Sequence, residues 1–176
     1  MKHSLLLLTL TLAPLAMGQA LKIPPSIEKL GQKASESVDV TLDGLMLKFA
    51  QDAVGDHDEE AKRVMRGLKS IRVRSFEFDK EGEYVAADVE TMRSQLNGPG
   101  WSRIAQVVSH KDKENVDVFL RIANSQIEGM VVLVAGAKEL TIVDIDGQIK
   151  PEDLGKLGGK AGIPSMDLRF GERAKK

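Results

Sequence analysis

The chain has 176 residues, 25 Lys and Arg against 26 Asp and Glu, a formal net charge of −1 and no cysteine. The balanced charge argues against a nucleic-acid binder, which needs a clustered basic face, and against a polybasic membrane-surface protein. The lack of cysteine excludes thiol catalysis, thiolate metal ligands and disulfides, so a single domain of this length must be held together by packing alone.

The first twenty residues have the pattern of a cleavable secretory signal peptide. A basic start at Lys2 precedes the apolar run Leu5–Ala13, and small residues follow up to Ala20. The run is too short to span a bilayer, which takes about 20 apolar residues. We expect cleavage after Ala20, with Gly18 as the alternative, and an exported protein in the periplasm or the medium. Removing residues 1–20 takes away one lysine and no acidic residue, which gives a formal net charge of −2.

Short elements are expected at the start of the single domain, which we place at residues 21–158. Ser26 has the hydroxyl and the position of an N-terminal cap for a short helix. Apolar and polar residues then alternate over 38–42, which is the period of a half-buried strand. Asp43-Gly44 turns the chain into an apolar segment over 45–50, which we expect to be helical.

A helix, a strand and a second helix are expected next. Asp56 precedes Glu59 by three residues, the spacing of a capping box, and predicts a helix with apolar residues up to Leu68. The strand expected over Ser70–Phe78 has apolar residues at both odd and even positions, which point to opposite faces of a sheet. This indicates either two covered faces or a bulge near Ser75. The clearest amphipathic helix follows, with apolar residues spaced four, three and four: Val85, Val89, Met92 and Leu96.

From Trp101 onward the pattern changes to strands. Short polar links join four runs of apolar and β-branched residues, which predicts antiparallel hairpins in a meander. Pro151 is expected to start a short helix, and residues 159–176 to form a flexible charged tail. Helices first and a meander later predict an α+β fold in two layers, a mainly antiparallel sheet with the helices packed on one face. The four runs are 101–109, 115–123, 127–135 and 140–146.

Four segments, in this order and spacing, resemble a known bacterial family. They are Val38–Gly44 before an apolar helix, Gly67–Val73 after a later one, Gly100–Ile104 at the start of the meander and Ile142–Ile149 before a short helix. Together they are similar to the domain of unknown function 4252 family over nearly all of residues 25–158. The resemblance implies an exported envelope protein without assigned activity, so it supplies no catalytic residues. Many relatives look like lipoproteins with a cysteine at the processing site; this chain has none, so we expect no lipid anchor.

The densest polar cluster is a candidate metal site. Asp56, His57 and Asp58 place carboxylate oxygens beside an imidazole, ligands that suit a divalent cation. The cluster lacks the alternating acids and the closing glutamate of a calcium loop. Acidic residues also favour the positive end of a helix dipole, and we prefer this simpler interpretation.

No catalytic constellation is recognisable in the sequence. His57 and His110 lie in different turns, and the strained Gly-x-Ser-x-Gly turn of many serine hydrolases is missing. Asp144 and Asp146 share one strand face and can serve acid–base chemistry if one is desolvated, although the simpler interpretation places them on the solvent side. No Gly-x-Gly-x-x-Gly or Walker pattern precedes a helix, so no cofactor is expected.

Trp101, the single tryptophan, is the candidate for a ligand or partner surface. A tryptophan in this position lines a groove or, as we prefer, fills the corner between a helix and the sheet. Export, the missing catalytic motif and the resemblance favour a non-catalytic binding or structural module with an envelope protein as partner. Two alternatives stay open: a small-molecule carrier with a pocket between helices and sheet, and a small hydrolase with a metal at Asp56, His57 and Asp58.

Overall fold

The computed structural model describes residues 21–54 and 58–153. The predicted signal peptide, the predicted tail over 159–176, and the candidate metal ligands Asp56 and His57 lie outside these ranges. The described elements, in chain order, are α1 (Pro25–Glu28), the 3-10 turn η1 (Leu30–Gln32), β1 (Glu36–Asp43), α2 (Gly44–Ala53), α3 (Glu59–Gly67), β2 (Leu68–Glu77), α4 (Ala86–Gln95), β3 (Trp101–Ser109), β4 (Glu114–Ala123), β5 (Gln126–Ala135), β6 (Glu139–Ile149) and the 3-10 turn η2 (Pro151–Asp153).

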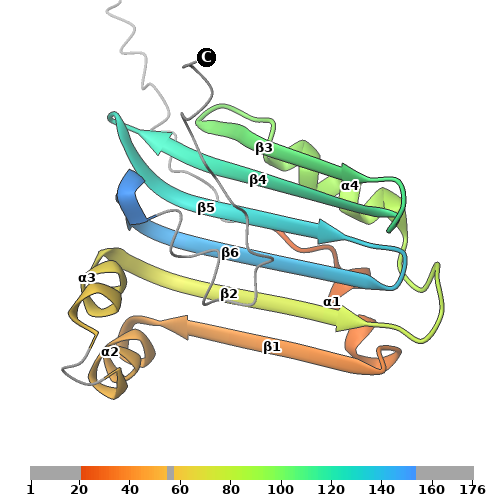
Figure 1. Ribbon diagram of the computed structural model, residues 1–176, viewed down its shortest axis with the longest axis horizontal. Helices are drawn as coiled ribbons and strands as arrows, with labels where there is room; N and C mark the ends of the chain where they lie inside the picture. The colour runs from red at the N-terminus through yellow and green to blue at the C-terminus, as the bar shows by residue number, and fades with distance from the viewer. Residues whose placement is uncertain (1–20, 55–57, 154–176) are drawn as a thin grey trace, which may run out of the picture.

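The strands form one open antiparallel sheet in the order β1-β2-β6-β5-β4-β3 (Figure 1). The last four strands of the chain are consecutive neighbours, so the predicted meander and the α+β class are confirmed. β2 then pairs with β6, which adds the antiparallel pair β1–β2 to the open side of the meander. As a result β1 and β3, at opposite ends of the sheet, are its edge strands.

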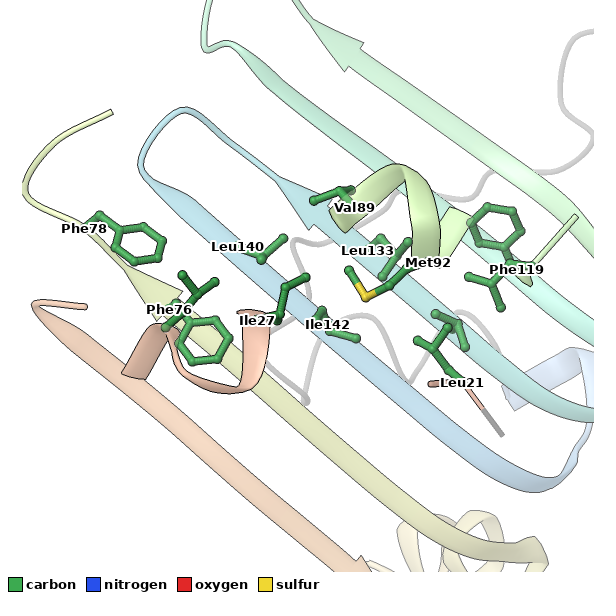
Figure 2. Close-up of a cluster of buried hydrophobic side chains, with 13 residues drawn as sticks. Leu21, Ile27, Phe76, Phe78, Val89, Met92, Phe119, Leu133, Leu140 and Ile142 are labelled. Atoms are coloured by element: carbon green, nitrogen blue, oxygen red, sulfur yellow. The ribbon is translucent and has the colours of Figure 1, made fainter. Parts of the chain in front are cut away.

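One face of the sheet is covered by α1 and α4, and we call it the helix face (Figure 2). Ile27 from α1 and the pair Val89 and Met92 from α4 are buried against it. Each such side chain stabilises the fold by roughly 1.5–3 kcal/mol when fully buried. The strand residues on this face are Phe76, Phe119, Val131, Leu133, Leu140 and Ile142.

The opposite face carries a second core, and we call it the valine face. Among the described residues, Leu47 of α2 is the helix residue that joins this cluster. The one-face arrangement of helices therefore holds for α1 and α4, while α2 packs at one end of the other face, beside β1, β2 and α3 (Figure 1). The buried strand residues of the valine face are Leu68, Val116, Val118, Leu120, Met130, Val132, Val134, Val143, Ile145 and Ile149.

β2 contributes to both cores, which explains why its apolar residues occur at both odd and even positions. Ile71 and Val73 lie on the valine face, and Phe76 is buried on the helix face. The register shift against β6 falls between Leu68 and Ser70, at the start of the strand. The expected bulge near Ser75 is therefore wrong, and the alternative of two covered faces is correct.

Close approach of two backbones explains this shift. Gly147 in β6 has φ +132°, and a Cβ placed there would lie 2.5 Å from the carbonyl oxygen of Gly67 at the end of α3. A larger residue at position 147 would meet both a strained backbone and a steric clash. Both glycines belong to segments that carry the family resemblance, and the contact gives their presence a physical reason.

Two expectations about helix ends need correction. Ser26 lies inside α1 rather than at its N-cap, because Pro24 precedes a helix that already starts with proline. Its hydroxyl instead donates to Asp88 Oδ2 at 2.6 Å, which ties α1 to α4. Val85, expected on the apolar side of the fourth helix, is 60% exposed, because it precedes the first helical turn with extended backbone.

Candidate functional site

Asp144 and Asp146 of β6 lie on the helix face, and each is paired with an arginine from another strand of the sheet. Arg72 of β2 binds Asp144, and Arg121 of β4 binds Asp146. The predicted shared face is correct, but the expected solvent side is wrong for Asp144, which is buried. Burial raises the pKa of Asp144, and the neighbouring Arg72 offsets only part of this effect. The arginine holds the carboxylate in place, and this is how a charged pair is tolerated beside an apolar core.

Trp101 starts β3 next to these ion pairs. The guanidinium of Arg121 lies 5.6 Å from the centre of the indole ring, and the same group donates to the carbonyl of Glu128 at 2.8 Å. Trp101 is half-buried and packs against the helix-face core. This packing agrees with the role of a corner residue, and a ligand or partner surface at Trp101 stays a prediction.

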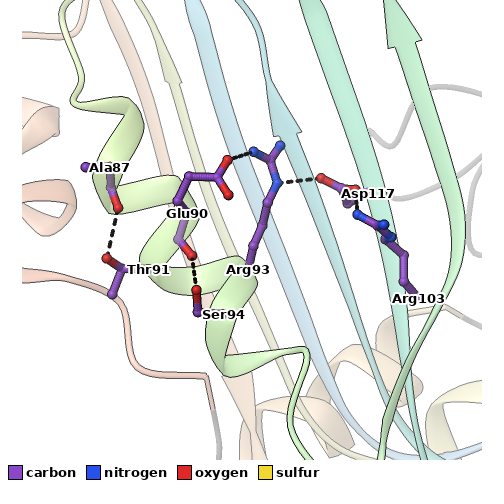
Figure 3. A network of polar contacts seen from close by, with 7 residues as sticks. All are labelled: Ala87, Glu90, Thr91, Arg93, Ser94, Arg103 and Asp117. Atoms are coloured by element: carbon purple, nitrogen blue, oxygen red, sulfur yellow. Dashed lines mark hydrogen bonds and ion pairs between the residues drawn. The ribbon is translucent and has the colours of Figure 1, made fainter.

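A second charged cluster was missed by sequence reasoning (Figure 3). Asp117 of β4 is fully buried, and its two oxygens accept from Arg93 Nε at 2.6 Å and from Arg103 Nη1 at 3.3 Å. Arg93 also pairs with Glu90 on α4. Burial acts to lower the pKa of Arg93, but the hydrogen bonds and charges of Asp117 and Glu90 outweigh it and raise the pKa. The cluster links α4 to the sheet and has the character of a structural anchor.

Asp58 has a structural role at the start of α3. Its Oδ1 accepts a hydrogen bond from the backbone N–H of Ala61 at 2.9 Å, so Asp58 is the N-cap. The capping box expected from Asp56 is therefore wrong in its position, by two residues. No group of three or more His, Asp or Glu that could hold a metal occurs within residues 21–54 and 58–153. Since Asp56 and His57 lie outside these ranges, the metal site and the hydrolase stay untested predictions.

The remaining candidates fall at separate places. His110 lies in the exposed turn between β3 and β4, as expected for a hairpin loop. The turn joins β4 to β3, the edge strand opposite β1. His110 therefore lies beside the edge strand β3, whereas Asp58 begins α3, which contacts α2 and β6. The carrier with a pocket between helices and sheet also stays a prediction.

The most distinctive surface runs along β1 into α2, and we call it the β1–α2 surface. It consists of five exposed apolar side chains: Val38, Val40, Leu45, Met46 and Phe49. Leu45 and Phe49 are 62% and 57% exposed and are four residues apart, so they share one side of α2. Exposed apolar residues that gather in one place mark interaction sites more often than scattered ones do.

The backbone of β1 adds to this surface. β1 pairs with β2 in unbroken register from Glu36 to Asp43, and no strand among the described residues pairs with its other side. The second edge strand, β3, has a register shift between Arg103 and Ala105. Bulges of this kind discourage pairing with a further strand, and a regular edge favours it. β1 is therefore the edge better suited to accept an added strand.

The β1–α2 surface was also missed by sequence reasoning. The sequence predicts a helix over 45–50, and the five apolar residues of this segment exceed what one buried side of a helix requires. Only Leu47 of this run is buried. This excess of apolar residues was the signal in the sequence that could have indicated an exposed apolar surface.

The family described as Domain of unknown function (DUF4252) matches residues 32–157. The chain belongs to this family. The DUF4252 match extends from η1 beyond η2, so it includes all six described strands and the contact between Gly67 and Gly147. No curated protein and no solved structure gives a significant match. In the described part of this DUF4252 protein, no helix has the length and apolar character needed to cross a membrane.

Proposed function

We propose that this DUF4252 chain is an exported envelope protein that acts as a non-catalytic binding module. The observation that carries the proposal is the β1–α2 surface, where a regular strand edge and exposed apolar side chains occur together. Its partner is an envelope protein that adds an extended segment to β1 and places apolar side chains against α2. Strand addition of this kind obtains affinity from main-chain hydrogen bonds and specificity from alternate side chains.

The side chains of β1 suit such a partner. Val38 and Val40 point to the valine face and continue toward α2, so an added strand would find apolar contacts along one of its sides. On the other side of β1, Asp39 is exposed and pairs with Arg74, which offers a polar contact. A partner segment with alternating apolar and polar residues matches both sides.

Export is supported by the sequence of residues 1–20. The basic start, the short apolar run and the small residues before Leu21 fit the pattern that the secretion machinery and its peptidase recognise. Expression with a C-terminal tag, followed by cell fractionation and N-terminal sequencing, tests this part. We expect a shortened chain outside the cytoplasm that starts at Leu21 or at Gln19. An unshortened cytoplasmic chain would refute export.

Affinity capture from the native envelope tests the binding role. The bait is the tagged chain, compared with Phe49→Glu, which places a charge in the β1–α2 surface. The matched control is Val107→Glu on the opposite edge strand, a residue of similar exposure. We expect one reproducible partner with the wild type and the control, and at least about tenfold less with Phe49→Glu, since one charge in an apolar contact costs more than about 1.4 kcal/mol. Equal capture by all three baits would refute this location.

A further inference from the structure

β1 forms one outer edge of the sheet (Figure 1), and its charged side chains all have the same sign. The strand carries Glu36, Asp39 and Asp43 but no lysine or arginine, and all three side chains are exposed. The opposite edge strand, β3, has a single charged residue, Arg103, which pairs with the buried Asp117. The two edges therefore differ in charge, and a charged partner segment distinguishes between them.

Two of these carboxylates lie on the same side of β1. Val38 and Val40 point to the valine face, so Asp39, which stands between them, points to the helix face. Asp43 follows four residues later and points to the same face, about 13 Å further along the strand. The free edge of β1 therefore presents an apolar side and an acidic side to any strand that pairs with it.

The neighbouring strand β2 neutralises only part of this acidic side. Arg74 of β2 binds Asp39, yet the Asp39 side chain stays 64% exposed toward the free edge. Asp43 is opposite Ser70, which carries no charge. Although Asp43 is the N-cap of α2, its side chain makes no capping hydrogen bond. The carboxylate of Asp43 is therefore available to a cation on an added strand.

The same charges disfavour a second copy of this chain at the edge. Charged side chains on an edge strand oppose pairing with strands of like charge. An antiparallel pair of β1 strands keeps its apolar sides together only when odd-numbered residues face odd-numbered residues. Registers centred on the strand then place Asp39 or Asp43 of the two copies directly opposite or diagonally beside each other. A strand of opposite charge meets no such repulsion.

We propose that the partner segment added to β1 is basic, with lysine or arginine residues that alternate with apolar residues. Two basic residues four positions apart place one cation opposite Asp39 and the other opposite Asp43. The residue between them faces Thr41, and the apolar residues lie on the side of Val38 and Val40. This inference rests on the proposed function and adds the charge of its partner.

Three labelled synthetic peptides test the charge of the partner on the full chain. Each has nine residues that alternate between threonine and valine, and the third and seventh residues are both lysine, both threonine or both glutamate. This placement is symmetric, so either strand direction aligns the two charges. At about 50 mM salt we expect the lysine peptide to bind at least about tenfold more tightly than the glutamate peptide in fluorescence anisotropy. At about 500 mM salt the ratio should fall below about threefold, because salt screens exposed charges.

Reversing one charge on β1 locates the effect. Asp43→Lys replaces one attraction by a repulsion, so the affinities for the lysine and glutamate peptides should come within about threefold of each other. The matched control Asp112→Lys makes the same change of charge in the exposed turn beside β3 and should keep the preference for lysine. Because Asp43 makes no capping hydrogen bond, the variant should keep the circular dichroism spectrum of the wild type.

Two results would overturn the basic partner and leave the proposed surface in place. These are equal affinity of the wild type for the three peptides, or a preference for lysine that Asp43→Lys and Asp112→Lys change alike. In both cases Phe49→Ser, which removes an apolar contact without adding charge, would still weaken the binding of all three peptides. If instead no peptide shows saturable binding up to about 1 mM, strand addition at β1 is refuted together with the inference that rests on it.

Discussion

Removing the buried carboxylate of Asp117 should strongly destabilise the protein. Asp117→Ala leaves Arg93 and Arg103 without the acceptor that both share, in a place from which water is excluded. Breaking a buried ion pair by deleting one partner costs about 3–5 kcal/mol. Arg103 is 43% exposed and can turn toward solvent, and Arg93 keeps Glu90. Both facts favour the lower end, about 3 kcal/mol, which corresponds to a fall in Tm of about 6–12 °C.

Urea unfolding followed by circular dichroism measures this loss, and two variants sharpen it. Asp39→Ala removes a carboxylate that is paired with Arg74 but is 64% exposed, so it should cost at most about 1 kcal/mol. Asp117→Leu combined with Arg93→Met replaces the pair by apolar groups and should recover most of the stability. A loss below about 1 kcal/mol for Asp117→Ala, equal to that of Asp39→Ala, would refute the anchoring role.

Three further changes follow from the structure. Gly147→Ala should lower the free energy of unfolding in urea by about 1–3 kcal/mol, because Gly147 has a positive φ and lies against Gly67. The loss should exceed that of Gly82→Ala, because Gly82 also has a positive φ but has open space around it. Burial, with the charges of Glu114 and Glu77, raises the pKa of Glu139 in the folded protein. Between the pKa of Glu139 in the unfolded chain and its higher pKa in the folded protein, the folded protein binds more protons. The free energy of unfolding therefore falls as the pH rises through this window. Glu139→Gln should therefore raise stability at pH 7 by about 0.2–1 kcal/mol and lose this gain below about pH 4; an equal gain at both pH values would contradict the cause. Asp58→Ala should cost about 0.5–2 kcal/mol through loss of the cap on α3, and Asp58→Ser should restore most of it.

The sequence predicted the strands well because their signal is local. The four runs of the meander matched β3 to β6 within three residues, since β-branched alternation and short polar links depend only on neighbours in the chain. The position of Asp117 could not be predicted in the same way. Its alternation with Val116 and Val118 indicates a solvent-facing residue, and only the packing of α4 turns that side into an interior.

The local sequence pattern also could not predict which apolar residues stay exposed. The run around Leu47 predicts a helix, but the choice of Leu47 as the buried member depends on where α2 meets β1 and β2. The same limit applies to Asp144, which alternation placed toward solvent and which the sheet order places beside Arg72. Local periodicity predicts elements, and tertiary pairing determines which of their sides become surface.

A photo-crosslinking residue at Leu45, in cells with a native envelope, tests the binding role most directly. The same residue at Val107 serves as control, because both positions are exposed and lie on opposite edges of the sheet. We expect one discrete crosslinked protein from position 45, none from position 107, and loss of the product on adding Phe49→Glu. Equal patterns from both positions, or a product from position 45 that contains only a second copy of this chain, would contradict a partner protein at the β1–α2 surface.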